Sequence, residues 1–108
     1  MARTQVVRRR PAVKISEKQF QDRILAFCRW TGLRAYHVYD SRKSAPGFPD
    51  LVIVGPKGVI FAELKSATGK LSEHQRDWLH DLARAGQKTF VWRPSDWGQV
   101  EKELRQLL

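Results

Sequence analysis

The stretch GFPDLVIVGPKGVIFAELKSATGKLSEHQ, from Gly47 to Gln75, decides the fold of this chain. Its two apolar runs, DLVIV and GVIFAEL, flank the short connection GPK, which is typical of a hairpin between two antiparallel strands. Charged residues interrupt this apolar pattern: Asp50 opens the first run, and Glu63 and Lys65 lie at the end of the second. A buried charge costs free energy unless it is paired, so these three residues require a chemical explanation.

The segments on either side of this stretch predict helices and further strands. Ser16 and Ser72 both stand at capping-box spacing before a glutamine, and we expect a helix to begin at each. Gly32 and Gly86 should end these two helices. Ser95 is expected to cap a short helix near the end of the sequence. Two more strands are expected in RAYHVY, at 34–39, and KTFVWR, at 88–93.

The predicted order of elements is α-β-β-β-α-β-α, which makes an α/β domain. A small mixed β-sheet flanked by helices is the simplest architecture for this order. The continuous apolar run Leu51–Val54 predicts a strand that is covered on both faces. Residues 1–14 read as a flexible basic arm and residues 15–108 as one folded domain, since 108 residues suffice for one core but not for two.

Composition favours an anionic partner. Twenty lysines and arginines against eleven aspartates and glutamates leave a formal net charge of +9, and nucleic acid is the first candidate. Neither an apolar stretch of about 20 residues nor a signal peptide is recognisable, so we expect a soluble, cytoplasmic protein without membrane contact. A phage-encoded protein acting in its host cell would fit this description. The single cysteine, Cys28, excludes an intramolecular disulfide and a thiolate zinc site.

The spacing of the charged residues predicts a reaction. Alternate residues of a strand share a face, so Glu63 and Lys65 should point the same way, and the hairpin should place Asp50 across from them. Two carboxylates suit a hard divalent cation such as Mg²⁺, and the lysine can activate water and offset charge on a phosphate. These groups together are suited to the hydrolysis of a phosphodiester bond. The alternative is an exposed ion pair that contributes less than about 1 kcal/mol.

These residues resemble the motif of the PD-(D/E)xK nuclease superfamily, with its restriction-endonuclease-like core. A closer resemblance is to the VRR-Nuc family of virus-type replication and repair nucleases, and it runs from about Ser16 to the end of the sequence. The matching blocks are SEKQFQDRIL at 16–25, YHVYDSRKSAPGFPDLVIV at 36–54, FAELKSATGKLSEHQRDWL at 61–79 and VWRPSDW at 91–97.

The resemblance implies the roles of individual residues. Asp50, Glu63, the Leu64 carbonyl and Glu17 would be metal ligands for Mg²⁺ or Mn²⁺, and Lys65 would be the catalytic lysine. An acid after a helix N-cap is also expected from the helix dipole alone, which leaves two readings of Glu17.

Gln75 likewise has two readings. It matches a family glutamine that lies close to the active site, and it also completes the capping box begun by Ser72. We expect these two roles to compete for its side chain.

A basic loop and the basic arm are the candidate DNA-binding segments. Arg42, Lys43 and Ser44 precede Asp50 and could contact phosphates beside the scissile bond, although a solvated basic loop explains them nearly as well. The triplet DSR, which contains Arg42, matches the family. The arm would contribute further phosphate contacts through Arg8, Arg9 and Arg10.

The sequence therefore predicts a metal-dependent, structure-specific DNA endonuclease. The resemblance implies a homodimer that cuts branched DNA such as four-way Holliday junctions, which would serve DNA repair or recombination. A flap or nicking nuclease is an alternative of the same class. A non-catalytic basic DNA-binding module that has kept the nuclease fold is an alternative of a different class. A third possibility is a nuclease subunit that acts only within a larger replication or repair complex.

Overall fold

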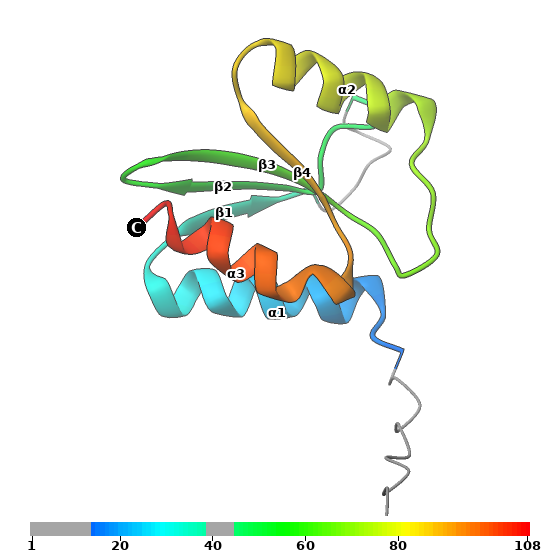
Figure 1. Cartoon of the computed structure of the whole chain (residues 1–108). Coiled ribbons are helices and arrows are strands. Elements are labelled where there is room, and N and C mark those ends of the chain that lie inside the picture. The colour runs from blue at the N-terminus through cyan, green and yellow to red at the C-terminus, as the bar shows by residue number, and fades with distance from the viewer. Residues whose placement is uncertain (1–13, 39–44) are drawn as a thin grey trace, which may run out of the picture.

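The computed structural model describes residues 14–38 and 45–108 (Figure 1). The predicted order of elements is confirmed, with one added 3₁₀ turn, η1, before the last helix. The elements are α1 Glu17–Thr31, β1 Arg34–His37, β2 Leu51–Gly55, β3 Gly58–Leu64, α2 Glu73–Arg84, β4 Lys88–Trp92, η1 Pro94–Asp96 and α3 Trp97–Arg105.

The four strands form one mixed sheet in the order β1-β2-β3-β4. The pairs β1/β2 and β2/β3 are antiparallel, whereas β3 and β4 are parallel. Gly55 pairs with Gly58, so the predicted hairpin turns through Pro56 and Lys57 alone. The backbone N–H of Lys57 donates to the carbonyl of Leu107 at 3.1 Å, which ties the hairpin to the chain after α3.

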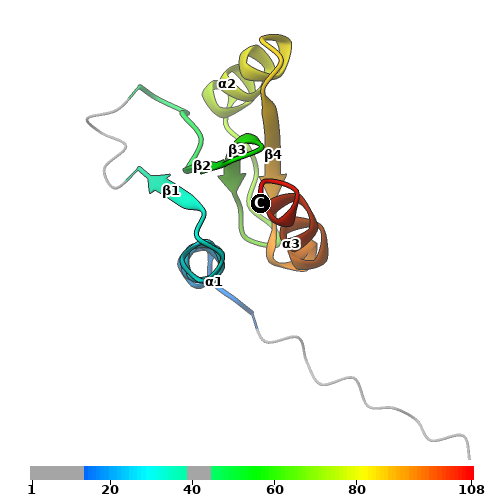
Figure 2. The ribbon, with the colours of Figure 1, turned by 90° about the vertical axis from the view of Figure 1, so that its left-hand side faces the viewer.

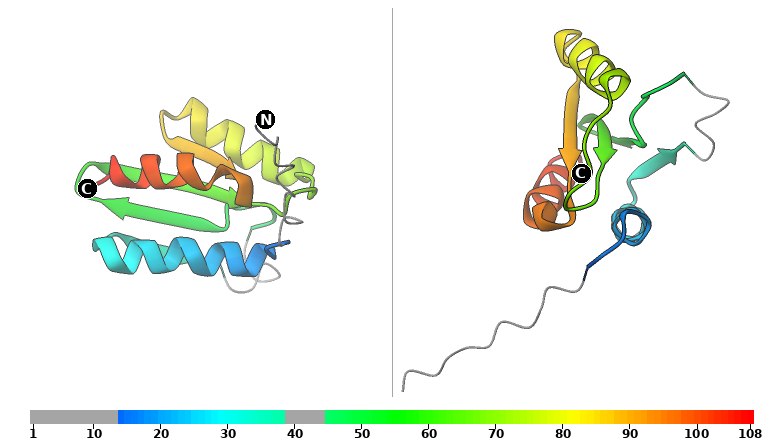
Figure 3. Two further views of the ribbon diagram at one scale, coloured as in Figure 1. Left: turned by 60° about the horizontal axis from the view of Figure 1, so that its bottom comes forward. Right: turned by 90° about the vertical axis from the view of Figure 1, so that its right-hand side faces the viewer.

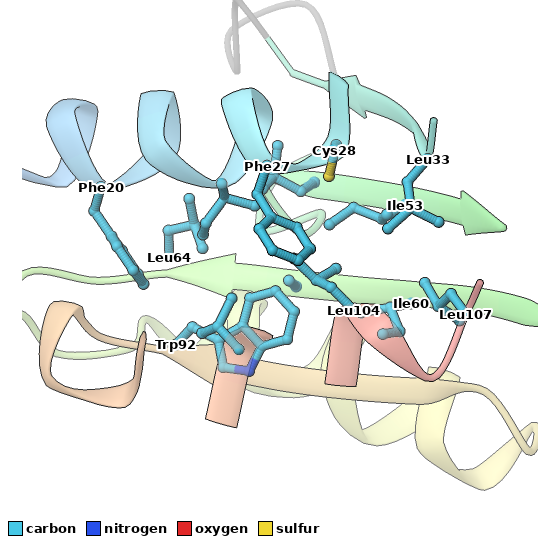
Figure 4. Packing of buried hydrophobic residues seen from close by; sticks show 14 residues of the cluster. Phe20, Phe27, Cys28, Leu33, Ile53, Ile60, Leu64, Trp92, Leu104 and Leu107 are labelled. Atoms are coloured by element: carbon cyan, nitrogen blue, oxygen red, sulfur yellow. The ribbon is translucent and has the colours of Figure 1, made fainter. Parts of the chain in front are cut away.

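Helices lie on both sides of this sheet. Figures 1 and 2 show α2 on one side and α1 and α3 on the other. Figure 3 shows that α1 and α3 run in the same direction along their shared face. The main core fills the space between these two helices and the sheet (Figure 4), and its buried residues are Phe20, Ile24, Phe27, Cys28, Leu33, Leu51, Ile53, Ile60, Ala62, Leu64, Trp92, Val100, Leu104 and Leu107.

The predicted helix boundaries are largely confirmed. The Ser16 hydroxyl accepts from the N–H of Gln19 at 3.1 Å, and the Gln19 side chain accepts from the N–H of Ser16 at 2.9 Å. Gly32 follows α1 with a φ of 79°, a left-handed conformation that glycine adopts at little cost. Gly86 follows the C-cap of α2 with a φ of 87°.

The prediction that Ser95 caps the last helix is wrong. Residues 94–96 form η1, and Asp96 occupies the N-cap position of α3 without making a side-chain cap. Its carboxylate instead accepts from the backbone N–H of Arg93 at 2.8 Å. A 3₁₀ turn that leads directly into α3 therefore replaces the predicted serine cap.

The expectation that β2 is covered on both faces is also wrong. Leu51 and Ile53 are fully buried on the core face, but Val54 on the other face is 40% exposed. The cause is the position of α2, which packs against the far edge strand β4 and leaves this part of the sheet uncovered.

In the described part of the chain, no helix is long and apolar enough to cross a membrane.

Candidate active site

The candidate site lies at the end of the sheet where α1 and α2 begin and β3 ends, on the right of Figure 1. The β2/β3 register pairs Leu51 with Ala62, so the next residues outward, Asp50 and Glu63, lie opposite each other. The Asp50 carboxylate accepts from the backbone N–H of Leu64 at 2.8 Å. The hairpin thus brings together the two acids that the strand pattern placed there.

Glu63 is the one buried charged residue in the described part of the chain, and its side chain is only 2% exposed. Its Oε1 accepts from the Gln75 amide at 3.3 Å, while its Oε2 meets no donor from the described residues. Burial is the main cause that raises the pKa of Glu63 from 4.5 to about 9. Hydrogen bonding of the protonated acid to Asp50, and the charge of Asp50, raise it further, and Lys65 opposes them.

Lys65 follows β3 directly and is half-buried. Its backbone N–H donates to the carbonyl of Trp92 at 3.0 Å and so continues the ladder between β3 and β4. Its charge lowers the pKa of both Glu63 and Glu17, which places the ammonium within electrostatic reach of both acids. Nevertheless, no ion pair within the described residues includes Lys65, so the simple ion-pair explanation of this motif receives no support.

Glu17 lies in the first turn of α1 with an exposed side chain. Desolvation and then the charge of Asp50 raise its pKa, whereas Lys65 lowers it. The pKa of Glu17 therefore depends on the charges of Asp50 and Lys65, as that of Glu63 does. The side chain of Glu17 does not join those of Asp50 and Glu63 in one cluster. Within residues 14–38 and 45–108, no three acidic, histidine or cysteine side chains form a group that could hold a metal ion.

Gln75 performs both of the roles that we expected to compete. Its Oε1 accepts from the backbone N–H of Ser72 at 2.8 Å, and its own N–H donates to the Ser72 hydroxyl at 3.2 Å. Its Nε2 meanwhile donates to Glu63. The expectation of a conflict is wrong because an amide has an acceptor at one end and a donor at the other.

The turn before Asp50 contains site-building residues that sequence reasoning missed. Gly47 has a φ of 82°, and a side-chain carbon there would lie 2.4 Å from the backbone of His74 in α2. Phe48 then packs edge-on against Trp78, with ring centroids 5.0 Å apart. These contacts join the segment that carries Asp50 to the helix that carries Gln75. A glycine in a turn before a motif acid is the only signal that could have suggested them.

Arg93 was also missed. Its Nη1 donates to the carbonyls of Ser66 and Gly69, at 2.6 and 2.7 Å, in the segment directly after Lys65. The available signal was topological: the carboxyl ends of parallel strands meet at one edge of a sheet, so a basic residue just after β4 must lie near the end of β3.

Two of the residues present, Asp50 and Glu63, have the chemistry to hold a divalent cation. Asp50 and Glu63 are held close despite mutual repulsion, and an oxygen of the buried acid lacks a donor from the described chain. Such a pair can share a cation that keeps several waters, as Mg²⁺ does. Leu64, the predicted carbonyl ligand, is fully buried at the end of β3. The six predicted DNA-binding residues, Arg8, Arg9, Arg10, Arg42, Lys43 and Ser44, lie outside the described residues.

Comparison with known proteins agrees with this fold. A solved VRR_NUC domain protein matches with a TM-score of 0.65 at 18% identity, covering 88% of this chain and 89% of that one. Hjc from Archaeoglobus fulgidus, a Holliday junction resolvase from an archaeal hyperthermophile, matches with a TM-score of 0.52 at 23% identity over 70% of this chain and 67% of that one. At these identities both likenesses establish the fold, which is restriction-endonuclease-like.

A search among curated proteins found no match. The family model of the VRR-NUC domain matches residues 2–106, which is nearly the whole chain. The chain therefore belongs to the VRR-NUC domain family of nucleases.

Proposed function

We propose that this protein is a metal-dependent, structure-specific endonuclease that hydrolyses phosphodiester bonds in branched DNA. The observation that carries the proposal is the pairing of Asp50 with the buried Glu63, beside a lysine that no ion pair of the described residues neutralises. Holding two carboxylates together costs free energy, and a bound cation would recover it. Family membership supports the nuclease reaction itself.

Each residue of the site has a role in this proposal. Asp50 and Glu63 would hold Mg²⁺ or Mn²⁺, with the Leu64 carbonyl and Glu17 as further oxygen donors. When bound, the cation supplies Lewis-acid stabilisation of the scissile phosphate and makes water a better nucleophile. Lys65 would orient the attacking water and offset the charge that develops on the phosphate. Gln75 would keep Glu63 in place.

Branched DNA, and a four-way junction in particular, is the substrate we infer. The fold likeness to a Holliday junction resolvase supports this choice, as does the formal net charge of +9. Symmetric resolution of a junction needs two active sites, and this chain carries one, so a homodimer would supply the second. The basic residues at 8–10, together with Arg42, Lys43 and Ser44, would hold the DNA backbone. Repair and recombination would both use such an activity.

The decisive test compares end-labelled four-way junction, flap and linear duplex DNA as substrates. Each is incubated with Mg²⁺, Mn²⁺ or EDTA, using the wild-type protein, Lys65→Ala and Lys70→Ala. Lys70 is an exposed lysine a few residues further along the same segment, which makes it a matched control for lost charge. We expect paired, metal-dependent cuts in the junction, at least about 100-fold slower in Lys65→Ala and unchanged in Lys70→Ala.

Other outcomes would replace the proposal. Cutting restricted to flaps or nicked duplexes would make the protein a flap or nicking nuclease. Salt-sensitive junction binding that ignores EDTA, with no cutting under either metal, would indicate a DNA-binding module that has kept the nuclease fold. Equal loss of activity in both lysine variants would show that charge near the site matters and that Lys65 has no special role.

A further inference from the structure

The segment after Lys65 is held by the side chain of Arg93, the residue directly after β4. Residues Ser66 to Gly69, here called the 66–69 turn, leave the sheet directly after β3. Within this turn the N–H of Gly69 donates to the Ser66 hydroxyl at 3.0 Å. From outside it, Arg93 donates to both terminal carbonyls of the turn through one nitrogen, Nη1. Both of these bonds are short, and hydrogen bonds from a charged donor are among the strongest in proteins.

The held turn lies beside the side chain of Lys65. A side-chain carbon added at Gly69 would come within 3.4 Å of Cδ of Lys65, so Gly69 borders the space that the lysine stem occupies. The backbone of Lys65 is fixed on its other side by the bond to the carbonyl of Trp92, the residue before Arg93. Consecutive residues at the end of β4 therefore hold both the backbone of Lys65 and the turn beside its stem.

Arg93 is itself held in place by its own backbone. Its backbone N–H donates to the Asp96 carboxylate at 2.8 Å, which fixes the start of η1. Its guanidinium forms no ion pair with any acid among residues 14–38 and 45–108. The charge of Arg93 is thus directed at two neutral carbonyls. Such an arrangement adds geometric order to the turn, because a planar guanidinium sets the direction of its bonds as well as their strength.

We propose that Arg93 is a positioning residue that orders Lys65 for catalysis by clamping the 66–69 turn. This inference rests on the proposed nuclease function for the catalytic role of Lys65. It assigns Arg93 no contact with substrate, metal or the reacting atoms. Loss of the clamp lets the turn open and the lysine stem sample several rotamers, while the acids on β2 and β3 keep their places.

The test uses the whole protein with Arg93→Gln and Arg93→Lys. The matched control is Arg76→Gln, which removes an exposed arginine that makes one longer bond, 3.2 Å, to the carbonyl of Leu71 at the other end of the same segment. Thermal melts first establish that each variant folds. Hydrogen exchange of the Gly69 amide and NMR relaxation of the Lys65 Cε then report the order of the turn and of the lysine without DNA or metal. Junction cleavage with Mg²⁺ provides kcat, KM and their salt dependence.

We expect both Arg93 variants to exchange the Gly69 amide faster and to disorder the Lys65 stem. We expect kcat to fall by up to about 100-fold, as small misplacements of catalytic groups do, with KM and the salt dependence unchanged. Lysine should not rescue, because its side chain is shorter and its ammonium cannot take the place of Nη1 between the two carbonyls. Arg76→Gln should match the wild-type protein in every readout.

Two results would overturn the inference. Unchanged exchange at Gly69 would show that the turn is ordered without Arg93. A raised KM, with a salt slope reduced by about one and with rescue by lysine, would show instead that Arg93 contacts a DNA phosphate. If the wild-type protein cuts no DNA at all, the proposed function fails, while exchange at Gly69 and the order of Lys65 still decide whether the clamp exists.

Discussion

Replacing Glu63 with glutamine should stabilise the metal-free protein while it removes a proposed metal ligand. Glutamine keeps the size of the side chain, its Oε1 can still accept from Gln75, and its amide can donate to Asp50 as the protonated acid would. What it removes is the ionisation of a buried acid whose pKa is raised from 4.5 to about 9. The gain in stability should therefore depend on pH in a defined way.

The sign follows from proton binding. The folded protein binds the Glu63 proton more tightly than the unfolded chain, so the stability it contributes is complete below pH 4.5 and is lost as the pH rises towards about 9. Each pH unit in this range costs about 1.4 kcal/mol, so near pH 7 the loss is at most roughly 3 kcal/mol. Glu63→Gln escapes this loss, which for a domain of this size corresponds to a melting temperature higher by on the order of 10 °C.

The assay is urea or thermal unfolding in EDTA near pH 5, 7 and 8.5. The control is Glu103→Gln, a partly buried glutamate on α3 away from the site. We expect the advantage of Glu63→Gln to grow from pH 5 to pH 8.5, and added Mg²⁺ to raise the melting temperature of the wild-type protein alone. A variant that is less stable than wild type, or an advantage that is equal at all three pH values, would refute the reasoning.

Two further pairs of substitutions test the packing that builds the site. Gly47→Ala should cost about 2 kcal/mol or more and abolish junction cleavage, because the added carbon meets the backbone of α2 and φ is 82°; Gly98→Ala, with nothing within 4 Å of its added carbon, should instead stabilise α3 by about 0.5–1 kcal/mol in the same unfolding assay. Leu107→Ala should lower the free energy of unfolding in urea by about 2–5 kcal/mol, because Leu107 is fully buried behind the hairpin. Leu108→Ala, at an exposed position, should change it little.

Local patterns predicted the parts of the site that depend on neighbours in sequence. The alternation of a strand and the connection GPK were enough to place Asp50 across the hairpin near Glu63 and Lys65, and serine–glutamine spacing located the starts of both main helices. These features are set by hydrogen bonds between residues a few positions apart. Their geometry is the same wherever the sequence occurs.

Contacts between distant segments could not be predicted in this way. Arg93 reaches a turn 24 to 27 positions earlier in the chain, and no period in the sequence records that distance. Val54 is exposed because α2 packs over β4. The apolar run around Val54 does not indicate which strand this helix covers. Gln75 was misjudged because its two ends were treated as one functional group. In each case the sequence does not record where the contacting group lies in space.

The two-ended amide of Gln75 affects how substitutions at this position are scored. A glutamate here would still accept from the N–H of Ser72 and begin the helix, since serine followed by glutamate is an equally good capping box. It would, however, replace the donor that faces Glu63 with another acceptor. A library that ranks variants by the amount of folded protein would pass this change as neutral. Under the proposed function, we expect a library ranked by cleavage to detect the loss of the bond to Glu63.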